Sequence, residues 1–180
     1  MTPDALKQGT IAIPGTYTTA ALLLKLWLGA DLNLKVLRFD QIMPAVASGR
    51  ADAGLIIHES RFTFGGHGLI SLADLGDWWE SQTGDAIPLG GIVARRSLDP
   101  NLIQNFDRCL RKSIDYAWQN LDEVTGFMKV HAQEMDLPVM HQHVALYVNE
   151  RTRDLGGEGH AAIDRLFEKA REQGLLKTPG

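Results

Sequence analysis

The spacing of hydrophobic residues in the first part of the chain switches between the period of strands and that of helices. Residues 10–13 form a short β-branched and apolar run that Pro14 and Gly15 close, which predicts a buried strand ending in a turn. Strong helix formers fill residues 20–28 up to Gly29, which predicts a helix. The chain therefore begins with a strand-turn-helix unit.

A second unit of the same kind follows. Residues 34–38 alternate as a strand does, and Asp40 is placed to cap a short helix that stops at Gly49. Residues 53–57 are almost continuously apolar, which is typical of a strand covered on both faces in a parallel sheet. This alternation predicts an α/β fold.

After residue 57 the pattern becomes less regular. We predict a loop at residues 58–68, a strand at 69–72, a short helix at 75–82 and a strand at 89–94.

From Pro100 onward the pattern is helical. Helices are predicted at residues 101–119, at 121–131, after Pro138 and at 159–173. The composition changes near residues 96–100, so we predict an α/β lobe with the cleft residues at 1–97 and a helical remainder at 98–180.

Composition narrows the class of partner. The 180 residues carry 22 acidic and 18 basic side chains, a net charge of −4, without long runs of one sign. This argues against a nucleic-acid or membrane surface and favours a small molecule or another protein as partner. The single cysteine, Cys109, cannot form an internal disulfide, and neither a secretion signal nor a long apolar span is visible. We expect a cytoplasmic protein.

His58 directly follows the predicted third strand. In open parallel sheets, ligands bind outside the carboxyl ends of the strands, so this histidine is a candidate general base. A structural histidine satisfied by its neighbours is the alternative. Glu59 would point away from His58 and is expected to be a solvated or paired carboxylate.

Thr18 and Thr19 lie where the first strand gives way to a helix. The first amides of a helix have no partners within it and attract anions, so a substrate carboxylate can bind there with the hydroxyls as added donors. Ordinary helix capping by one threonine is the alternative. In a parallel sheet, this turn and His58 face the same edge.

Other candidates have weaker patterns. The spacing of His131, His141, His143 and His160 predicts no metal site. Trp78 and Trp79 are expected to divide between the core and a lobe interface. Neither a nucleotide-binding glycine motif nor a serine-hydrolase elbow occurs, so no nucleotide cofactor is implied.

Several blocks of the chain resemble the 1,4-dihydroxy-6-naphthoate synthases. The blocks are Pro14-Gly15, Thr18-Thr19-Ala20, Ser48-Gly49, residues 52–61, Asp74-Leu75-Gly76, Trp78-Trp79 and residues 88–92. The resemblance extends through residues 147–149 to near the end, whereas Gly49 and Asp52-Ala53 alone would indicate only a fold similar to type II periplasmic binding proteins.

The resemblance implies two α/β lobes around a cleft and a lyase of the futalosine route to menaquinone. The implied substrate is cyclic dehypoxanthinylfutalosine, with His58 as proton acceptor and Thr18 and Thr19 in contact with it. No metal or organic cofactor is implied. A non-catalytic binding module of the same fold and chorismate dehydratase remain the alternatives, although the block at residues 58–60 argues against the latter.

Family members begin with a segment that forms much of the first lobe, and no counterpart is visible in this sequence. We therefore expect the chain alone to be a poor catalyst. We also expect helices after Pro100 to expose apolar faces, which favours self-association or binding of the missing segment.

Overall fold

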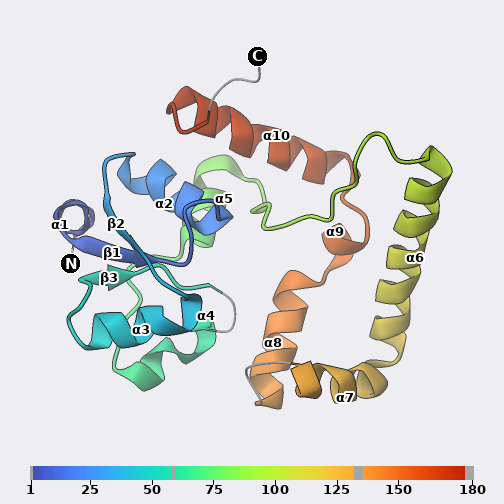
Figure 1. Cartoon of the computed structure of the whole chain (residues 1–180), viewed down its shortest axis with the longest axis horizontal. Helices are drawn as coiled ribbons and strands as arrows, with labels where there is room; N and C mark the ends of the chain where they lie inside the picture. The colour runs from blue at the N-terminus through green and yellow to red at the C-terminus, as the bar shows by residue number, and fades with distance from the viewer. Residues whose placement is uncertain (1, 58–59, 132–135, 177–180) are drawn as a thin grey trace. The chain divides into compact units, whose positions relative to one another are not determined.

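The computed structural model describes residues 2–57, 60–131 and 136–176. Its elements are, in chain order, α1 (Pro3–Gln8), β1 (Thr10–Ile13), α2 (Thr19–Leu28), β2 (Asn33–Val36), α3 (Phe39–Ala47), β3 (Ala53–Gly54), α4 (Ser60–Thr63), η1 (Phe64–His67), α5 (Leu75–Thr83), α6 (Pro100–Gln119), α7 (Leu121–His131), α8 (Leu137–Tyr147), α9 (Glu150–Arg153) and α10 (Gly156–Glu172) (Figure 1).

The strands of the described residues form one parallel sheet in the order β2-β1-β3. The central strand, β1, pairs with β2 along its whole length, with Thr10 opposite Asn33. It pairs with β3 at Ile11 opposite Ala53. The predicted mixed α/β class with a parallel sheet is confirmed.

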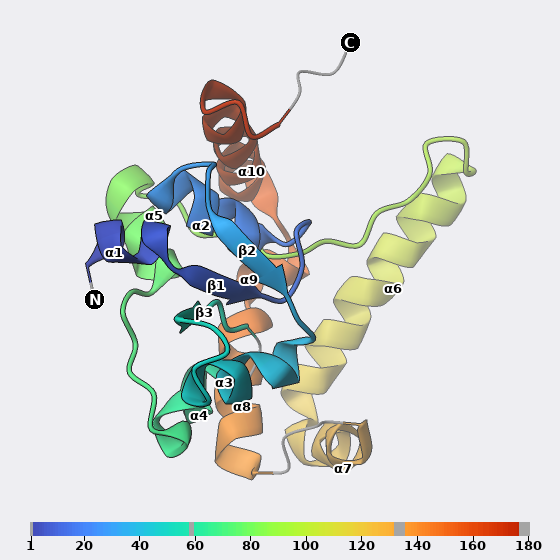
Figure 2. The same ribbon diagram turned by 60° about the vertical axis from the view of Figure 1, so that its left-hand side comes forward.

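Helices α2 and α3 cover opposite faces of this sheet (Figure 1 and Figure 2). Successive side chains of a strand point to opposite faces. Ile11 and Ile13 therefore share a core cluster with Leu24 of α2, whereas Ala12 between them packs with Ile42 of α3. Burial on both faces explains the continuous apolar run in β1.

Strand β3 is shorter than the strand predicted at residues 53–57, although the Leu55 amide still donates to a carbonyl of β1 over 2.8 Å. Gly54 permits a close approach of β3 to α3, since a Cβ there would lie 2.5 Å from Cγ2 of Ile42. Any side chain at this position would push α3 away from the sheet.

The long helices agree with the predicted pattern, but the start of α3 does not. Asp40 lies in its first turn and does not cap it. The guanidinium of Arg38 donates to both Asp40 carboxylate oxygens over 2.7 and 2.5 Å, so the carboxylate is already engaged. This pairing lowers the Asp40 pKa from its ordinary value.

Three other predictions of secondary structure were wrong. Residues 60–67 form α4 and η1, where a loop was predicted. Residues 69–72 and 89–94, all of them described, form no strand, because they do not pair with the sheet. The short helices α1 and α9 were not predicted.

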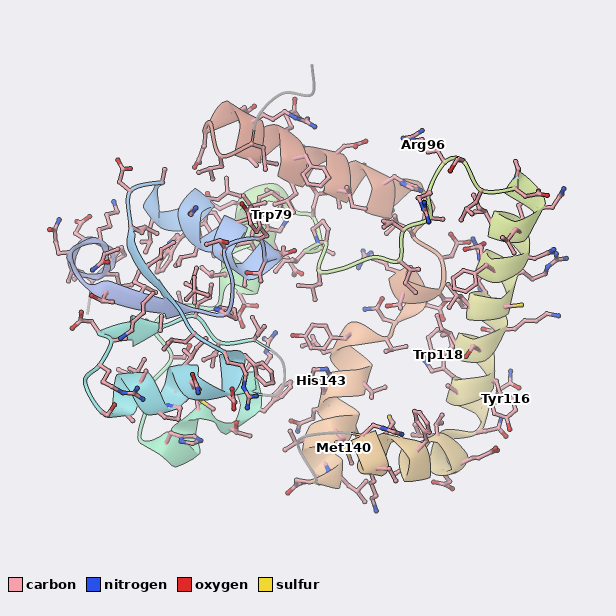
Figure 3. The ribbon with its side chains drawn as sticks, viewed as in Figure 1. Trp79, Arg96, Tyr116, Trp118, Met140 and His143 are labelled. Carbon is pink, nitrogen blue, oxygen red and sulfur yellow. The ribbon has the colours of Figure 1, made fainter. Side chains whose placement is uncertain are left out.

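The chain divides into two compact units. Unit 1 contains residues 1–89 and 160–180, and unit 2 contains residues 90–159. Leu166 of α10 belongs to the same core cluster as Leu23 and Trp79, and this helix belongs to unit 1 from His160 onward. Trp79 is labelled in Figure 3. The predicted lobes at residues 1–97 and 98–180 stay a prediction.

The units differ in their cores. Unit 1 contains three clusters of buried hydrophobic residues. Among the described residues of unit 2, Met140 is the only buried hydrophobic side chain. None of the described helices is both long enough and apolar enough to cross a membrane.

Candidate functional site

The sheet topology identifies one edge as the expected ligand site. The connection through α2 leads from β1 to one neighbour, β2, whereas the connection through α3 leads across β1 to the other neighbour, β3. The carboxyl ends of β1 and β3 therefore flank the point where the strand order reverses, which is where open α/β sheets bind ligands.

The β1–α2 turn, residues 14–19, lies directly after the carboxyl end of β1. Thr18 is the N-cap of α2 with extended backbone angles, φ −102° and ψ 150°. Its Oγ1 accepts a hydrogen bond from the Ala21 amide over 3.1 Å and donates to the Gly15 carbonyl over 3.0 Å. The capping role that the sequence allowed for one threonine is therefore present.

Thr19 is tied to a distant part of unit 1. Its Oγ1 donates to the Leu89 carbonyl over 3.0 Å, although the two residues are 70 positions apart. Since a threonine hydroxyl has one proton, Thr18 and Thr19 both use theirs on carbonyl groups in this state. The donors that remain for an anion are the first backbone amides of α2 other than that of Ala21, which already donates to Thr18.

The turn is open on its outer side. Tyr17 is fully exposed, at 102% of its reference area, and Thr16 is also exposed. An exposed aromatic ring beside helix amides suits a ligand that has both a flat ring and a carboxylate. Sequence reasoning did not single out Tyr17, and its position between Gly15 and the capping Thr18 was the available signal.

His58, the predicted base, and Glu59 lie outside the described residues. The described chain resumes at α4, where Nη2 of Arg61 pairs with Oδ2 of Asp74 over 2.7 Å. The other oxygen of Asp74 caps α5 by accepting the amides of Gly76 and Asp77 over 2.8 and 3.3 Å. One carboxylate therefore links α4 to the start of α5.

Trp78 and Trp79 lie side by side on α5. Trp79 is only 2% exposed and belongs to a core cluster with residues of α2 and α10, while the half-buried Trp78 packs against this cluster. Their ring centroids are 6.4 Å apart. Trp79 is therefore a core residue, as the sequence reasoning allowed.

The remaining histidines do not converge on a metal. Within the described ranges, no group of three or more His, Cys, Asp or Glu side chains could hold a metal ion. The His131 ring lies 4.5 Å from Phe127, and that of His143 lies 4.5 Å from Tyr147. These contacts give both histidines packing roles.

Unit 2 contains two charged pairs that link α6 to residues 153–154. Arg153 donates to both carboxylate oxygens of Asp115, and this lowers the Asp115 pKa. Arg111 pairs with Asp154, whose pKa is lowered first by the Gly156 amide and then by this guanidinium. Tyr116 and Trp118 lie on opposite sides of α6 (Figure 3).

A cavity of about 290 Å³ lies near these pairs, lined by Glu150, Arg151 and residues 154–158. Oppositely charged side chains bridge its wall, with Arg151 4.0 Å from Glu158. The cavity contains none of the residues singled out from the sequence.

Comparison with known proteins finds a family model and relatives that match most of this chain. A family model described as menaquinone biosynthesis matches residues 2–172. A 1,4-dihydroxy-6-naphtoate synthase of Thermus thermophilus is 46% identical, with 96% of this chain and 63% of that protein aligned. A protein of the same name from Streptomyces coelicolor is 44% identical, with 97% of this chain and 64% of that protein aligned.

A crystal structure of an Archaeoglobus fulgidus protein has a TM-score of 0.90 and 37% sequence identity, covering 95% of this chain and 64% of that one. The chain thus spans a little under two thirds of the length of each of these relatives.

Proposed function

Because the chain belongs to the menaquinone biosynthesis family, we propose that it carries the activity named in its relatives, the formation of 1,4-dihydroxy-6-naphthoate. The proposed reaction is a carbon–carbon lyase step on cyclic dehypoxanthinylfutalosine. The observation that carries the proposal is the family match over residues 2–172, which includes the β1–α2 turn.

The β1–α2 turn supports recognition of the substrate carboxylate. The start of α2 presents backbone amides at the positive end of the helix dipole, next to the point where the strand order reverses. Thr18 and Thr19 hold these amides in place through their bonds to Gly15, Ala21 and Leu89. In the proposed complex, the carboxylate binds the amides, and the threonines contact the substrate.

His58 is the proposed general base. A neutral imidazole, with an ordinary pKa near 6.5, accepts a proton at neutral pH. Proton removal leads to cleavage of the bond to the sugar-derived carbons, and formation of the aromatic naphthoate supplies the driving force. No metal or organic cofactor takes part in this scheme.

For the whole protein, we propose a fold similar to type II periplasmic binding proteins. The three-stranded parallel sheet of unit 1, which has helices on both faces, supports one such α/β lobe. We further propose that the protein acts in the cytoplasm on a small molecule, without nucleic-acid or membrane partners.

A direct test is incubation of the chain with cyclic dehypoxanthinylfutalosine, and separately with chorismate, followed by mass spectrometry. The proposed function predicts 1,4-dihydroxy-6-naphthoate from the first and no conversion of the second. Dehydration of chorismate would replace the proposal by the related dehydratase activity. Binding of the futalosine derivative without turnover would favour a binding module.

A further inference from the structure

The segment between α5 and unit 2, which we call the strap (residues 84–89), is held to other elements of unit 1 along its length. It begins at Gly84, whose φ of +73° ends α5 and whose amide donates to the Glu80 carbonyl over 2.8 Å. It contains no helix or strand, so its path depends on the side-chain contacts that follow.

The first contact is an ion pair. The carboxylate of Asp85 pairs with Nε of Arg165, which lies on α10. The Asp85 side chain is 21% exposed, and its paired oxygen, Oδ2, is buried and makes no hydrogen bond within the described part of the chain, so the contact with Arg165 is an ion pair alone. A carboxylate so placed is costly to leave unpaired, so this contact ties the start of the strap to α10.

The second contact is apolar. Ile87 packs against the cluster that contains Leu23, Leu26, Trp79 and Leu166. These residues come from α2, α5 and α10, so the middle of the strap is fixed to the core of unit 1.

The third contact is the hydrogen bond from Thr19 Oγ1 to the Leu89 carbonyl. Thr18 closes its bonds within the turn and α2, whereas Thr19 connects the first turn of α2 to a different segment. First turns of helices fray readily, so a tie to a fixed segment orients the amides that an anion would use.

We propose that Arg165 is a positioning residue for the carboxylate end of the substrate. It acts through Asp85 and the strap on Thr19, and so on the start of α2, without touching the substrate. This inference rests on the proposed function, because it assumes that the β1–α2 turn receives the carboxylate.

The test compares Arg165→Gln, Arg165→Lys and Lys169→Gln. The last is a matched control that breaks an exposed ion pair of the same helix, Lys169 with Glu172, away from the strap. Calorimetry measures binding of 1,4-dihydroxy-6-naphthoate and of 1,4-dihydroxynaphthalene, which lacks the carboxylate. The ratio of the two affinities isolates the contribution of the carboxylate.

Arg165→Gln is expected to weaken binding of the acid by about three- to tenfold, the scale of one hydrogen bond, and binding of the analogue hardly at all. Arg165→Lys should restore much of the ratio, and Lys169→Gln should leave it unchanged. An equal loss for both ligands would mean that Arg165 is merely structural. An unchanged or tighter affinity for the acid would also overturn the inference.

A second readout needs no ligand. Hydrogen exchange of the amides at residues 84–87, of Leu89 and of Ala21 should accelerate in Arg165→Gln but not in Lys169→Gln. Unchanged exchange at Ala21 would overturn the coupling through the strap. If the unaltered chain does not bind the acid but the exchange pattern appears, the proposed function is wrong. The coupling from Arg165 through the strap to α2 is then still supported.

Discussion

Thr18 and Thr19 each have a structural role in addition to their proposed contact with the substrate. Their hydroxyls are already engaged with Gly15, Ala21 and Leu89, so they stabilise the turn as well as offering a site. Replacing both threonines by valine keeps their shape but removes these bonds. We expect the free energy of binding of 1,4-dihydroxy-6-naphthoate to weaken by about 1 to 3 kcal/mol, as measured by calorimetry.

Thr125→Val is the control for this pair, because the Thr125 hydroxyl likewise donates to a backbone carbonyl but lies on α7 in unit 2. It should leave the affinity unchanged. If the double valine variant folds and binds the naphthoate as well as the unaltered chain does, Thr18 and Thr19 are only capping and packing residues.

Asp74 allows two roles of one carboxylate to be separated. Asp74→Ala removes the cap of α5 and the Arg61 pair, and should lower the free energy of unfolding by about 0.5 to 2 kcal/mol in urea titration. Asp74→Asn keeps an oxygen for the cap and should cost less, because an ion pair with both side chains more than a third exposed contributes little. An equal loss in both variants would show that the ion pair dominates.

For single residues, the sequence predicts hydrogen bonds between neighbours along the chain and misses those between residues far apart in the chain. The Thr18 cap follows from neighbouring residues, and so was foreseeable. The Thr19 bond to Leu89 joins residues 70 positions apart, and the Asp85 pair with Arg165 depends on the same tertiary packing. Asp40 shows the opposite error. Its carboxylate was predicted to cap a helix, but it accepts hydrogen bonds from the nearby Arg38 instead.

Among the elements, two ion pairs join α6 to residues 153 and 154. The pKa values of Asp115 and Asp154 are lowered in the folded chain, so their pairs stabilise it above the ordinary carboxyl pKa. That contribution is lost as the pH falls below about 3.9, through the lowered folded values.

We therefore expect acid to loosen α6 before the sheet. Amide exchange of α6, corrected for intrinsic rates, should increase relative to that of β1 between pH 5 and pH 3. The Asp115→Asn and Asp154→Asn double variant, which cannot titrate at these positions, should show a smaller pH dependence. The same dependence in both chains would remove these carboxylates as the cause.

Helices were more predictable than strands for a physical reason. Caps and apolar spacing lie within the helix itself, so the ends of α2 and α5 were foreseen to within one residue. A strand needs a neighbouring strand, and residues 69–72 and 89–94 have suitable side chains but no such pairing. The missed helix α1 did carry local signals, with a Thr2 cap and Pro3 at its start.

In the whole molecule, stability should be uneven between the units. Unit 1 contains three clusters of buried apolar residues. Among the described residues of unit 2, only Met140 has a buried hydrophobic side chain. Large side chains such as Phe106, Phe127 and Val130 remain exposed by 53%, 68% and 77%. The predicted exposure of apolar residues after Pro100 is present in this chain.

Hydrogen exchange near neutral pH should therefore be faster in α6 and α7 than in β1 and α2 by about tenfold or more, after correction for intrinsic rates. The reason is that opening these helices exposes little new apolar surface. Equal protection in both units would show that the chain unfolds as one cooperative body.

The family was readable from short blocks of residues, and the α/β class from the alternation of strand and helix patterns in the first part of the chain. The packing of α10 on the core of unit 1, where Leu166 joins the cluster that contains Trp79, was not readable. Such contacts depend on how distant segments pack, which local patterns do not encode.

The most direct measurement of the proposed function is the rate at which the purified 180-residue chain converts cyclic dehypoxanthinylfutalosine to 1,4-dihydroxy-6-naphthoate, compared with that of His58→Asn. The account predicts slow but measurable formation of the naphthoate, reduced by roughly 100-fold or to background in the variant, with binding of the naphthoate nearly unchanged. Absence of product at any chain concentration, or a rate within a few-fold of the unaltered chain in His58→Asn, would contradict it.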